Sequence, residues 1–280
     1  MAVALAAIAP AYAQQGGGCA PSQACTAADC RPCHPWAGRR VAFLGDSMTD
    51  PRNKASNSKY WQRLADMLGL EAYAYGKSGR QWDDIPRQAN LLKAEHGDSV
   101  DAIIVFIGTN DFNAGVPLGQ WYTETEDTVT AAVHGEKRLY TRKRRTPDYD
   151  KNTLRGRINI AVKRLKELYP DKQTVLLTPI HRARAEFSPN NIQPDESWQN
   201  ICGEYFSAYV EAIKEAGGVW GVPVIDLNAV SGLNPMVKEQ QQYFHDPAAD
   251  LLHPNDKGQL RLAHTIMRQL MSLPVDFGER

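Results

Sequence analysis

The 280-residue sequence has no excess of charge of either sign, because 32 Lys and Arg residues balance 32 Asp and Glu residues. It therefore lacks the basic composition that draws a protein to nucleic acid or to an anionic membrane surface. No segment supplies the run of about 20 apolar residues that a membrane-spanning helix requires. The sequence thus predicts a globular protein with no nucleic-acid partner and no stable insertion in a membrane.

Two common catalytic motifs are also absent. Residues 76–78 read GKS, but a P-loop needs a glycine five positions before Gly76, and that position is Glu71. Residues 45–49 read GDSMT, which is not the G-x-S-x-G nucleophile elbow of α/β-hydrolases. Neither a phosphate-binding loop nor an α/β-hydrolase elbow is therefore expected.

Residues 1–13 have the pattern of a secretory signal peptide. A short apolar stretch ends in Ala11, Tyr12 and Ala13, an A-x-A cleavage pattern, although no Lys or Arg precedes it. We expect the mature protein to be exported to the periplasm or the extracellular space.

Residues 14–37 are interpreted as a cysteine-rich tether. Four of the five cysteines lie there, namely Cys19, Cys25, Cys30 and Cys33. Export is compatible with disulfides, whose pairing cannot be read from the sequence. Residues 30–34, CRPCH, also match a haem-attachment string, and four neighbouring thiolates match a zinc site. We favour disulfides and expect neither a cofactor nor a metal, because so short a segment cannot enclose a haem.

From residue 38 to residue 274, apolar runs alternate with amphipathic stretches. Strands are predicted within 39–45, 71–76, 101–108, 174–178 and 221–227, and helices within 58–69, 81–96, 158–169, 196–216 and 256–273. Because the strands are apolar throughout, they suit a parallel sheet that is covered on both faces. The predicted fold class is α/β, a three-layer α/β/α sandwich with a five-stranded parallel sheet. Residues 111–150 are predicted to be an irregular insertion rich in charge and turns.

Polar motifs follow three of the predicted strands, and a fourth precedes the last helix. Ser47 lies in GDSMTD, Gly79 in GKSGR and Asn110 in GTND, while Asp250 and His253 lie in DLLHPND. In open α/β sheets, ligands bind beyond the carboxyl ends of the strands. We therefore expect these five residues to meet on one rim of the sheet.

The five residues together meet the needs of acyl transfer. A serine hydroxyl becomes a nucleophile when a base takes its proton, and the imidazole of His253 titrates near neutral pH. Asp250 is expected to reach the same side of a helical turn or tight loop and to orient that imidazole. The N–H groups of Ser47 and Gly79 and the amide of Asn110 can stabilise an oxyanion, and losing one such donor typically costs about 10²–10³ in rate.

The blocks GDSMTD, GKSG, GTND and DLLHPN resemble those of the SGNH, or GDSL-type, hydrolases, in the same order over about residues 41–256. The resemblance implies a flavodoxin-like fold, hydrolysis of esters through an acyl-enzyme, and catalytic roles for the same five residues. We expect a serine esterase that acts on small acyl esters, above all acetyl esters of a carbohydrate. The expected partner is thus a small-molecule or glycan ester. A lipase or lysophospholipase and a non-catalytic glycan-binding protein are the alternatives. The oligomeric state stays open.

Other residues carry weaker signals. Trp82 and Trp121 flank the second and third motifs and are candidates for stacking on a sugar ring, although most aromatic residues belong to the core. His181 follows the fourth predicted strand and is a candidate substrate contact, and a surface histidine is an equal interpretation. His245 offers a rival base. The basic run 136–145 suits either an acidic ligand or a solvated loop.

Overall fold

A five-stranded parallel sheet forms the centre of the protein, as the sequence predicts. The structure is a computed structural model that describes residues 34–275 and 277. The strands pair in the order β2-β1-β3-β6-β9, and every pairing is parallel. Their bounds are β1 Arg40–Gly45, β2 Glu71–Ala74, β3 Ala102–Phe106, β6 Gln173–Leu177 and β9 Val224–Ile225. This 2-1-3-4-5 order of the parallel strands is that of the flavodoxin-like fold.

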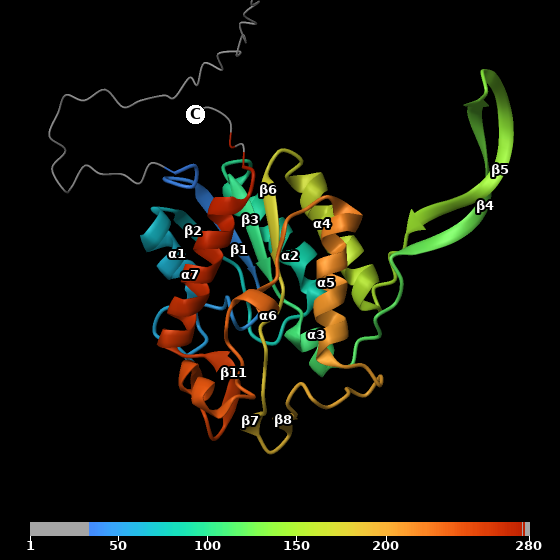
Figure 1. Cartoon of the computed structure of the whole chain (residues 1–280). Helices are drawn as coiled ribbons and strands as arrows, with labels where there is room; N and C mark the ends of the chain where they lie inside the picture. The colour runs from blue at the N-terminus through green and yellow to red at the C-terminus, as the bar shows by residue number, and fades with distance from the viewer. Residues whose placement is uncertain (1–33, 276, 278–280) are drawn as a thin grey trace, which may run out of the picture. The chain divides into compact units, whose positions relative to one another are not determined.

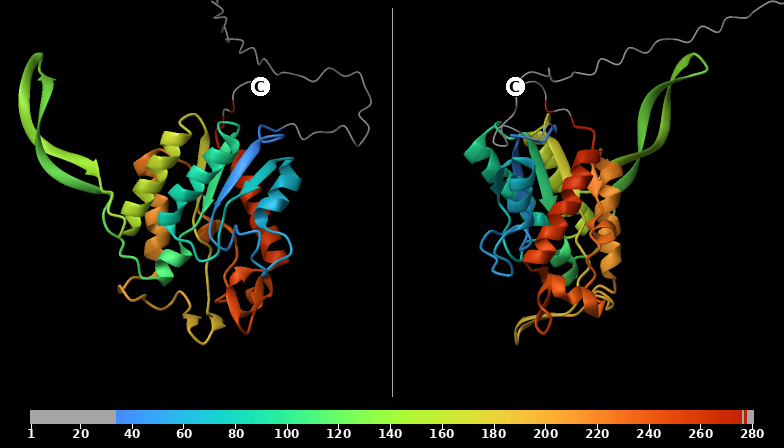
Figure 2. Two further views of the ribbon diagram at one scale, coloured as in Figure 1. Left: turned by 180° about the vertical axis from the view of Figure 1, so that it is seen from behind. Right: turned by 60° about the vertical axis from the view of Figure 1, so that its left-hand side comes forward.

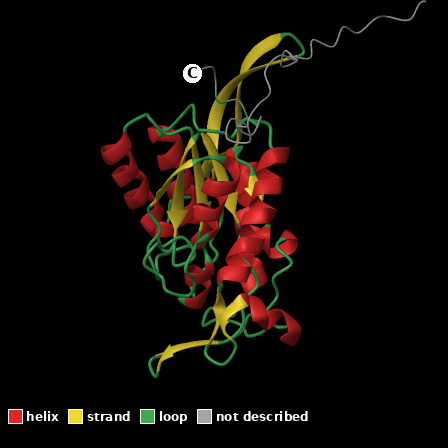
Figure 3. Ribbon diagram, turned by 90° about the vertical axis from the view of Figure 1, so that its left-hand side faces the viewer, coloured by secondary structure: helices red, strands yellow, loops and turns green. Residues whose placement is uncertain are grey.

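Helices cover both faces of the sheet (Figure 3). The long helices are α1 Tyr60–Leu68, α2 Ile85–His96, α4 Leu154–Leu168, α5 Phe206–Trp220 and α7 Asp256–Ser272. Shorter segments are α3 Thr109–Asn113, α6 Leu227–Val230, and the 3₁₀ turns η1 Trp82–Asp84 and η2 Lys238–Tyr243. Along β1, Ala42 and Leu44 pack with α2, α4 and α5, whereas Val41 and Phe43 pack with α1 and α7. The alternation of side chains along a strand thus builds two cores and the predicted three layers.

The long helices lie close to their predicted positions, with one exception. The helix expected at 196–216 begins ten residues later, at Phe206. Residues before it form a turn in which the Asn200 side chain accepts hydrogen bonds from the N–H groups of Cys202 and Glu204. Such Asn-centred turns compete with helical bonding, so the apolar periodicity alone placed the start too early.

The folded domain includes residues that were assigned to the tether. Trp36 is fully buried, its indole N–H donates to the carbonyl of Leu270 at 3.2 Å, and its ring meets Phe277 edge-on. The last four residues of the expected tether, 34–37, therefore belong to the described domain. The expected signal peptide, Cys19, Cys25, Cys30 and Cys33 lie outside the described residues.

The segment 111–150 is not irregular, as the sequence suggested, but contains a long β-hairpin. Strands β4 Tyr122–Val133 and β5 Glu136–Pro147 pair antiparallel over twelve residues each. His134 and Gly135 connect them with φ values of 51° and 84°, which is the backbone of a type I′ turn and matches the twist of a hairpin. Figure 1 shows this hairpin projecting from the side of α4 and α5.

A second, smaller sheet lies beyond the carboxyl ends of the parallel strands (Figure 1). It pairs in the order β10-β11-β7-β8, with bounds β7 Ala185–Ser188, β8 Asn191–Gln193, β10 Phe244–Asp246 and β11 Asp250–Pro254. These strands were not predicted from the sequence, because each has only three to five residues. In the part of the chain that the structure describes, no helix combines the length and hydropathy needed to cross a membrane.

Candidate active site

Ser47 lies in a tight turn directly after β1. The N–H groups of Thr49 and Asp50 both donate to the carbonyl of Asp46 and close the turn around it. Gly45 must be a glycine, because a Cβ there would lie 2.2 Å from the carbonyl oxygen of Phe106 on the neighbouring strand β3. The close approach of β1 and β3 thus places the serine at the carboxyl edge of the sheet.

Ser47, His253 and Asp250 form a continuous hydrogen-bonded chain. The Oγ of Ser47 lies 2.8 Å from Nε2 of His253, and Nδ1 of His253 lies 2.9 Å from Oδ2 of Asp250. All three residues are at least nine-tenths buried. Burial opposes ionisation of Asp250, but hydrogen bonds from the side chain and backbone of His253 prevail and lower its pKa. A carboxylate in this position keeps the Nδ1 proton on the ring, so Nε2 faces the serine as a proton acceptor.

The aspartate and the histidine lie on strand β11 rather than on the helical turn or tight loop that their spacing suggested. Two residues that are three apart point to opposite sides of a regular strand. Here Oδ1 of Asp250 accepts hydrogen bonds from the N–H groups of Leu252 and His253 at 3.1 and 3.0 Å. This local turn within the strand curls the backbone and brings the two side chains together. Downstream, Asn255 caps α7 by accepting from the N–H groups of Lys257 and Gly258.

Gly79, in the loop after β2, and Asn110, in the first turn of α3, face the same cavity. The loop after β2 is tied to the loop after β1, because Oδ2 of Asp50 accepts from both the N–H and the hydroxyl of Ser78 at 2.9 Å. Gly79 has φ of 78°, which disfavours any side chain. No residue within 34–275 accepts a hydrogen bond from the N–H of Ser47 or Gly79. Two backbone donors therefore remain available to a ligand beside the serine hydroxyl.

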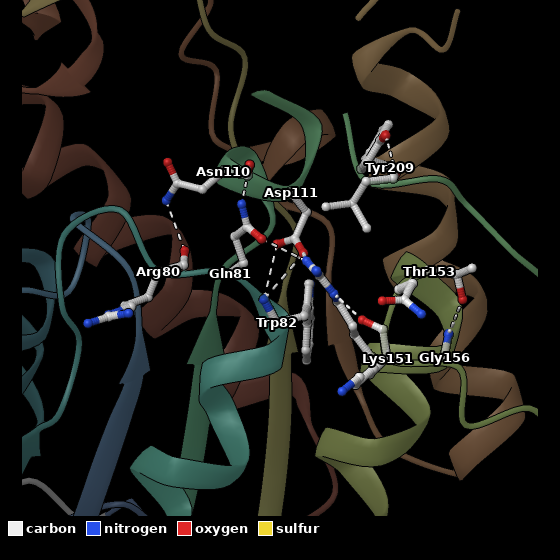
Figure 4. Close-up of polar contacts among 12 residues, drawn as sticks. Arg80, Gln81, Trp82, Asn110, Asp111, Lys151, Thr153, Gly156 and Tyr209 are labelled. Carbon is white, nitrogen blue, oxygen red and sulfur yellow. Dashed lines mark hydrogen bonds and ion pairs between the residues drawn. The ribbon is translucent and has the colours of Figure 1, made fainter. Parts of the chain in front are cut away.

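A hydrogen-bond network holds Asn110 in place (Figure 4). Its amide nitrogen donates to the carbonyl of Arg80 at 3.0 Å, and its own carbonyl accepts from the amide of Gln81 at 3.2 Å. The next residue, Asp111, is fully buried, accepts from the N–H of Trp82 and pairs with Arg157 at 3.0 Å. The loops after β2 and β3 are thus locked to each other and to α4.

Two carboxyl groups behind the site titrate far above their ordinary range. Burial raises the pKa of Asp46 to about 7, and the charge of nearby Asp111 adds to the increase. Burial likewise raises the pKa of Asp111 to about 7, although hydrogen bonds from Trp82 and Arg157 act against the increase. Asp46 also lies 3.4 Å from the amide nitrogen of Asn110. The protonation of this pair is therefore coupled to the support of Asn110.

The cavity around Ser47 has a volume of about 450 Å³, and most of its lining residues are of polar type. Its further lining residues are Asn53, Lys54, Ala55, Ser78, Phe187, Asn191, Gln193, His245 and Leu252. Phe187 is an exposed aromatic ring whose centre lies 5.5 Å from that of His253. Apart from Asp250, this lining contains no carboxylate. Such a cavity offers amide groups, one cation and one ring to a ligand.

Three of the weaker sequence candidates lie elsewhere. The prediction that Trp82 stacks on a sugar ring is wrong, because this side chain is fully buried in the core. Trp121 lines a separate cleft, where its indole donates to Glu215 at 2.7 Å. His181 lies 2.5 Å from Glu196 in another separate cleft, and this hydrogen bond raises its pKa. The rival base His245 does line the cavity, but its Nδ1 contacts the carbonyl of Ala55 rather than Ser47.

The structure also gives a place to Arg182, which follows the fourth predicted strand next to His181 and has the same two sequence interpretations, a substrate contact or a surface residue. Arg182 is almost fully buried, and its guanidinium donates to Thr109 Oγ1 at 3.1 Å and to Gln193 Oε1 at 2.9 Å. It therefore connects the first turn of α3, which carries Asn110, to the end of β8, which lines the cavity. The position after a strand did not indicate these partners, because Thr109 and Gln193 come from two other segments of the chain.

No cluster of His, Cys, Asp and Glu suited to a metal ion occurs among the described residues. Cys202 is a free, exposed thiol that contacts the carbonyl of Gly115. Around Ser47, the described residues form a hydrogen-bonded series of serine, imidazole and carboxylate, with free N–H donors beside it. That arrangement is characteristic of serine hydrolases.

Comparison with known proteins narrows the class. The chain belongs to the GDSL-like lipase/acylhydrolase family, whose model matches residues 43–261. The protein is accordingly a carboxylic ester hydrolase. A structure from Lactobacillus plantarum is 24% identical with a TM-score of 0.65, covering 85% of this chain and 99% of that chain. A possible lipase from Chitinophaga pinensis is 22% identical with a TM-score of 0.60, covering 82% and 98%. The comparison with curated proteins gives no match.

Proposed function

We propose that Ser47 is the nucleophile of a serine esterase and that His253 and Asp250 form its base. Nε2 of His253 takes the hydroxyl proton as Oγ of Ser47 attacks the ester carbonyl. The same proton then passes to the alcohol oxygen as the C–O bond breaks, which leaves an acyl-serine. A water molecule attacks that ester, again with His253 as the base, and the acid leaves as Ser47 recovers its proton.

The oxyanion of each tetrahedral intermediate is assigned to three donors. They are the N–H groups of Ser47 and Gly79 and the side-chain amide of Asn110. The free backbone donors at the cavity wall support this assignment, and Asn110 lines the same cavity with its backbone carbonyl held by the side chain of Gln81. Donors that are fixed before the charge develops contribute most to catalysis.

The observation that carries this proposal is the hydrogen-bonded series from Ser47 through His253 to Asp250. The 2.8 Å contact joins Ser47 and His253, which are 206 positions apart in the sequence, and the 2.9 Å contact joins His253 to Asp250, three positions before it. Both lie within the range of a proton-transfer pair. A structural histidine would not need a serine at one ring nitrogen and a buried carboxylate at the other.

For the substrate, we propose a small acyl ester, above all an acetyl ester, of a carbohydrate. The side chains of Asn53, Asn191 and Gln193 offer hydrogen-bonding groups to sugar hydroxyls, and Phe187 offers an exposed ring next to His253. Aromatic rings with adjacent amides suit a sugar, which has both an apolar face and polar edges. A long acyl chain would need a continuous apolar channel, whereas Ala55, Phe187 and Leu252 are the only apolar side chains in this lining.

Kinetics on a short activated acetyl ester test the mechanism. Ser47→Ala and His253→Ala should each lose at least about 10³-fold in kcat. His264→Ala, at a residue that lines a separate cleft, is the control and should retain the wild-type rate. His245→Ala tests the rival base and should keep a measurable kcat. Equal rates for wild type, Ser47→Ala and His253→Ala would end the esterase proposal.

A substrate panel tests the alcohol and acyl portions separately. Acetylated oligosaccharides should be hydrolysed with a higher kcat/KM than esters of the same alcohols with long acyl chains. Phe187→Ala should raise KM for an acetylated sugar and change KM for a small synthetic acetyl ester much less. Preference for long-chain esters would replace the carbohydrate esterase with a lipase.

We also propose that the protein is exported after cleavage behind Ala13, on the pattern of residues 1–13. The measurement is the intact mass of protein recovered from the periplasm or the medium. A mass that begins at Gln14 agrees with the proposal, whereas uncleaved protein retained in the cytoplasm contradicts it.

A further inference from the structure

Nearly every residue of the hairpin β4–β5 is exposed to solvent. Residues 123–130, 132–139 and 141–145 are all exposed. Its strands pair with each other only, and the hairpin extends away from the helices in each view of Figure 2. An isolated two-stranded hairpin is marginally stable in water. A partner that covers part of this hairpin would bury some of its exposed surface and stabilise it.

The two edges of the hairpin differ in charge. Strand β5 carries six cations, Lys137, Arg138, Arg142, Lys143, Arg144 and Arg145. The outer half of β4, residues 128–133, reads TVTAAV and has no charge, no proline and no glycine. Charged side chains, Lys above all, protect a free edge from pairing with another strand, and uncharged β-branched segments do not. The edge of β4 is therefore the unprotected one.

The turn at His134 and Gly135 shows which backbone groups point outward. In a two-residue hairpin, the flanking pair Val133 and Glu136 exchanges both backbone hydrogen bonds, and the pattern alternates from there. The N–H and C=O groups of residues 128, 130 and 132 consequently point away from β5. Thr130 lies at the centre of this free row, directly opposite Leu139 of β5.

We propose that β4 pairs antiparallel with β4 of a second copy of this chain about a two-fold axis. The product is a four-stranded sheet in the order β5-β4-β4-β5, with Thr130 of both copies at its centre. This register places Asp127 opposite Val133 and opposes no two like charges. It also closes the assembly as a dimer, because the same edge is used by both copies.

Two other edge pairings are conceivable, β5 with β5 and β4 with β5 of the next copy. The charges of β5 and the symmetry of the assembly favour β4 with β4. Neighbouring strands lie about 4.8 Å apart, so the two β5 strands of the dimer would be about 14 Å apart. That distance exceeds the screening length of about 8 Å at physiological ionic strength. Pairing β5 with β5 would instead bring the cations of both copies into adjacent strands. Pairing β4 with β5 of the next copy is head-to-tail and leaves an open end that continues to add copies.

Proline substitutions at two facing positions test the proposal with a matched control. Thr130→Pro removes an N–H that points outward from β4, and Leu139→Pro removes one that points outward from β5. Neither change breaks the β4–β5 ladder. The measurement is the molar mass of the full-length protein, from sedimentation or light scattering, over a concentration series. Wild type and Leu139→Pro should have twice the monomer mass of 31.1 kDa, and Thr130→Pro should have the monomer mass.

Three outcomes overturn the dimer: a wild type that stays monomeric at about 100 µM, a Thr130→Pro variant that stays dimeric, or loss of the dimer with Leu139→Pro alone. If both proline variants lose the dimer, cysteine crosslinking shows which edge forms the contact. The Cα atoms of facing residues in a hydrogen-bonded antiparallel pair are about 5.5 Å apart, within disulfide range. Thr130→Cys should form a crosslinked dimer that a thiol reductant releases, and Leu139→Cys and wild type should not. Equal crosslinking in Thr130→Cys and Leu139→Cys also contradicts the proposal.

Hydrolysis of the short acetyl ester serves as the folding check for both proline variants. The hairpin contributes no residue to the cavity around Ser47, so each variant should keep the wild-type rate per subunit. The mass and crosslinking measurements do not depend on turnover, so failure of the esterase assay in the wild type would remove this folding check and leave the test of the dimer itself in place.

Discussion

Replacing Arg157 by Met is expected to destabilise the protein in a way that depends on pH. Nη1 of Arg157 lies 3.0 Å from Oδ1 of Asp111, whose side chain is fully buried, and 2.7 Å from Oε1 of Gln81. The substitution keeps much of the aliphatic stem and removes the charge. It leaves an unpaired carboxyl group in the interior beneath Asn110.

The size of the effect follows from the cost of a buried charge without its partner. Removing one member of a buried ion pair typically costs about 3–5 kcal/mol of unfolding free energy. The pKa of Asp111 is already about 7, against an ordinary value of 3.8, and the arginine acts to lower it. Without Arg157 that pKa rises further, so the variant avoids part of the cost by keeping the proton.

The sign of the pH dependence follows from linkage. A carboxyl whose folded pKa is raised stabilises the fold fully below its unfolded pKa, and this contribution is lost as pH rises through the folded pKa. For wild type the loss ends near pH 7. For Arg157→Met it continues to higher pH, by about 1.4 kcal/mol for each additional pH unit. The difference in stability between the two proteins should therefore be small at about pH 5 and large at about pH 9.

Urea unfolding followed by circular dichroism at these two pH values measures the difference. Asp111→Asn combined with Arg157→Met should remove its pH dependence, because no carboxyl remains to ionise. Arg164→Met, which removes an exposed arginine of the same helix paired with Glu167, should change stability by less than about 1 kcal/mol. A penalty for Arg157→Met that is equal at both pH values would show that lost packing, not charge, is responsible and would refute the reasoning.

Three further predictions concern the residues around the site. Gly79→Ala should lower the free energy of unfolding by about 1–2 kcal/mol, because the φ of 78° at this position is unfavourable for a side chain. It should also lower kcat by up to about 10²-fold if the N–H moves. An unchanged kcat would remove Gly79 from the oxyanion site. Asp46→Asn should flatten the fall in urea stability of wild type between about pH 4 and pH 7, since its pKa of about 7 corresponds to at most about 4 kcal/mol across that range; an identical pH profile would contradict the raised pKa. Arg182→Met should lower kcat by up to about 10²-fold through displacement of Thr109 and Gln193, with little change in unfolding free energy, because an arginine without a carboxylate partner is costly to bury; a large loss of stability with normal kcat would make it a purely structural residue.

The central sheet was predictable because its information is local. Each parallel strand is buried on both faces, so β1 and β3 read as continuous apolar runs ended by a glycine. The carboxyl ends of such strands share one edge of the sheet, so the motifs around Ser47, Gly79 and Asn110 were expected to lie together. All three line one cavity.

The hairpin and the small sheet were missed for different reasons. Strands β4 and β5 are exposed on both faces, so burial imposed no alternation of apolar and polar residues on them. Strands β7, β8 and β10 have only three or four residues each, too few for any periodicity. The backbone of Asp250–Pro254 pairs with β7 and β10, which come from separate segments of the chain.

By itself, the sequence determined the α/β class, the parallel sheet, most of its helices and the residues that could supply acyl-transfer chemistry, because these depend on neighbours within a few positions. Only the tertiary structure decided that Trp82 is core, that Trp121 and His181 lie in other clefts, and that Arg182 joins two loops of the site. It also decided the raised pKa values of Asp46 and Asp111. Desolvation and charge coupling depend on distances between segments that are remote in the sequence, and no local pattern encodes those distances.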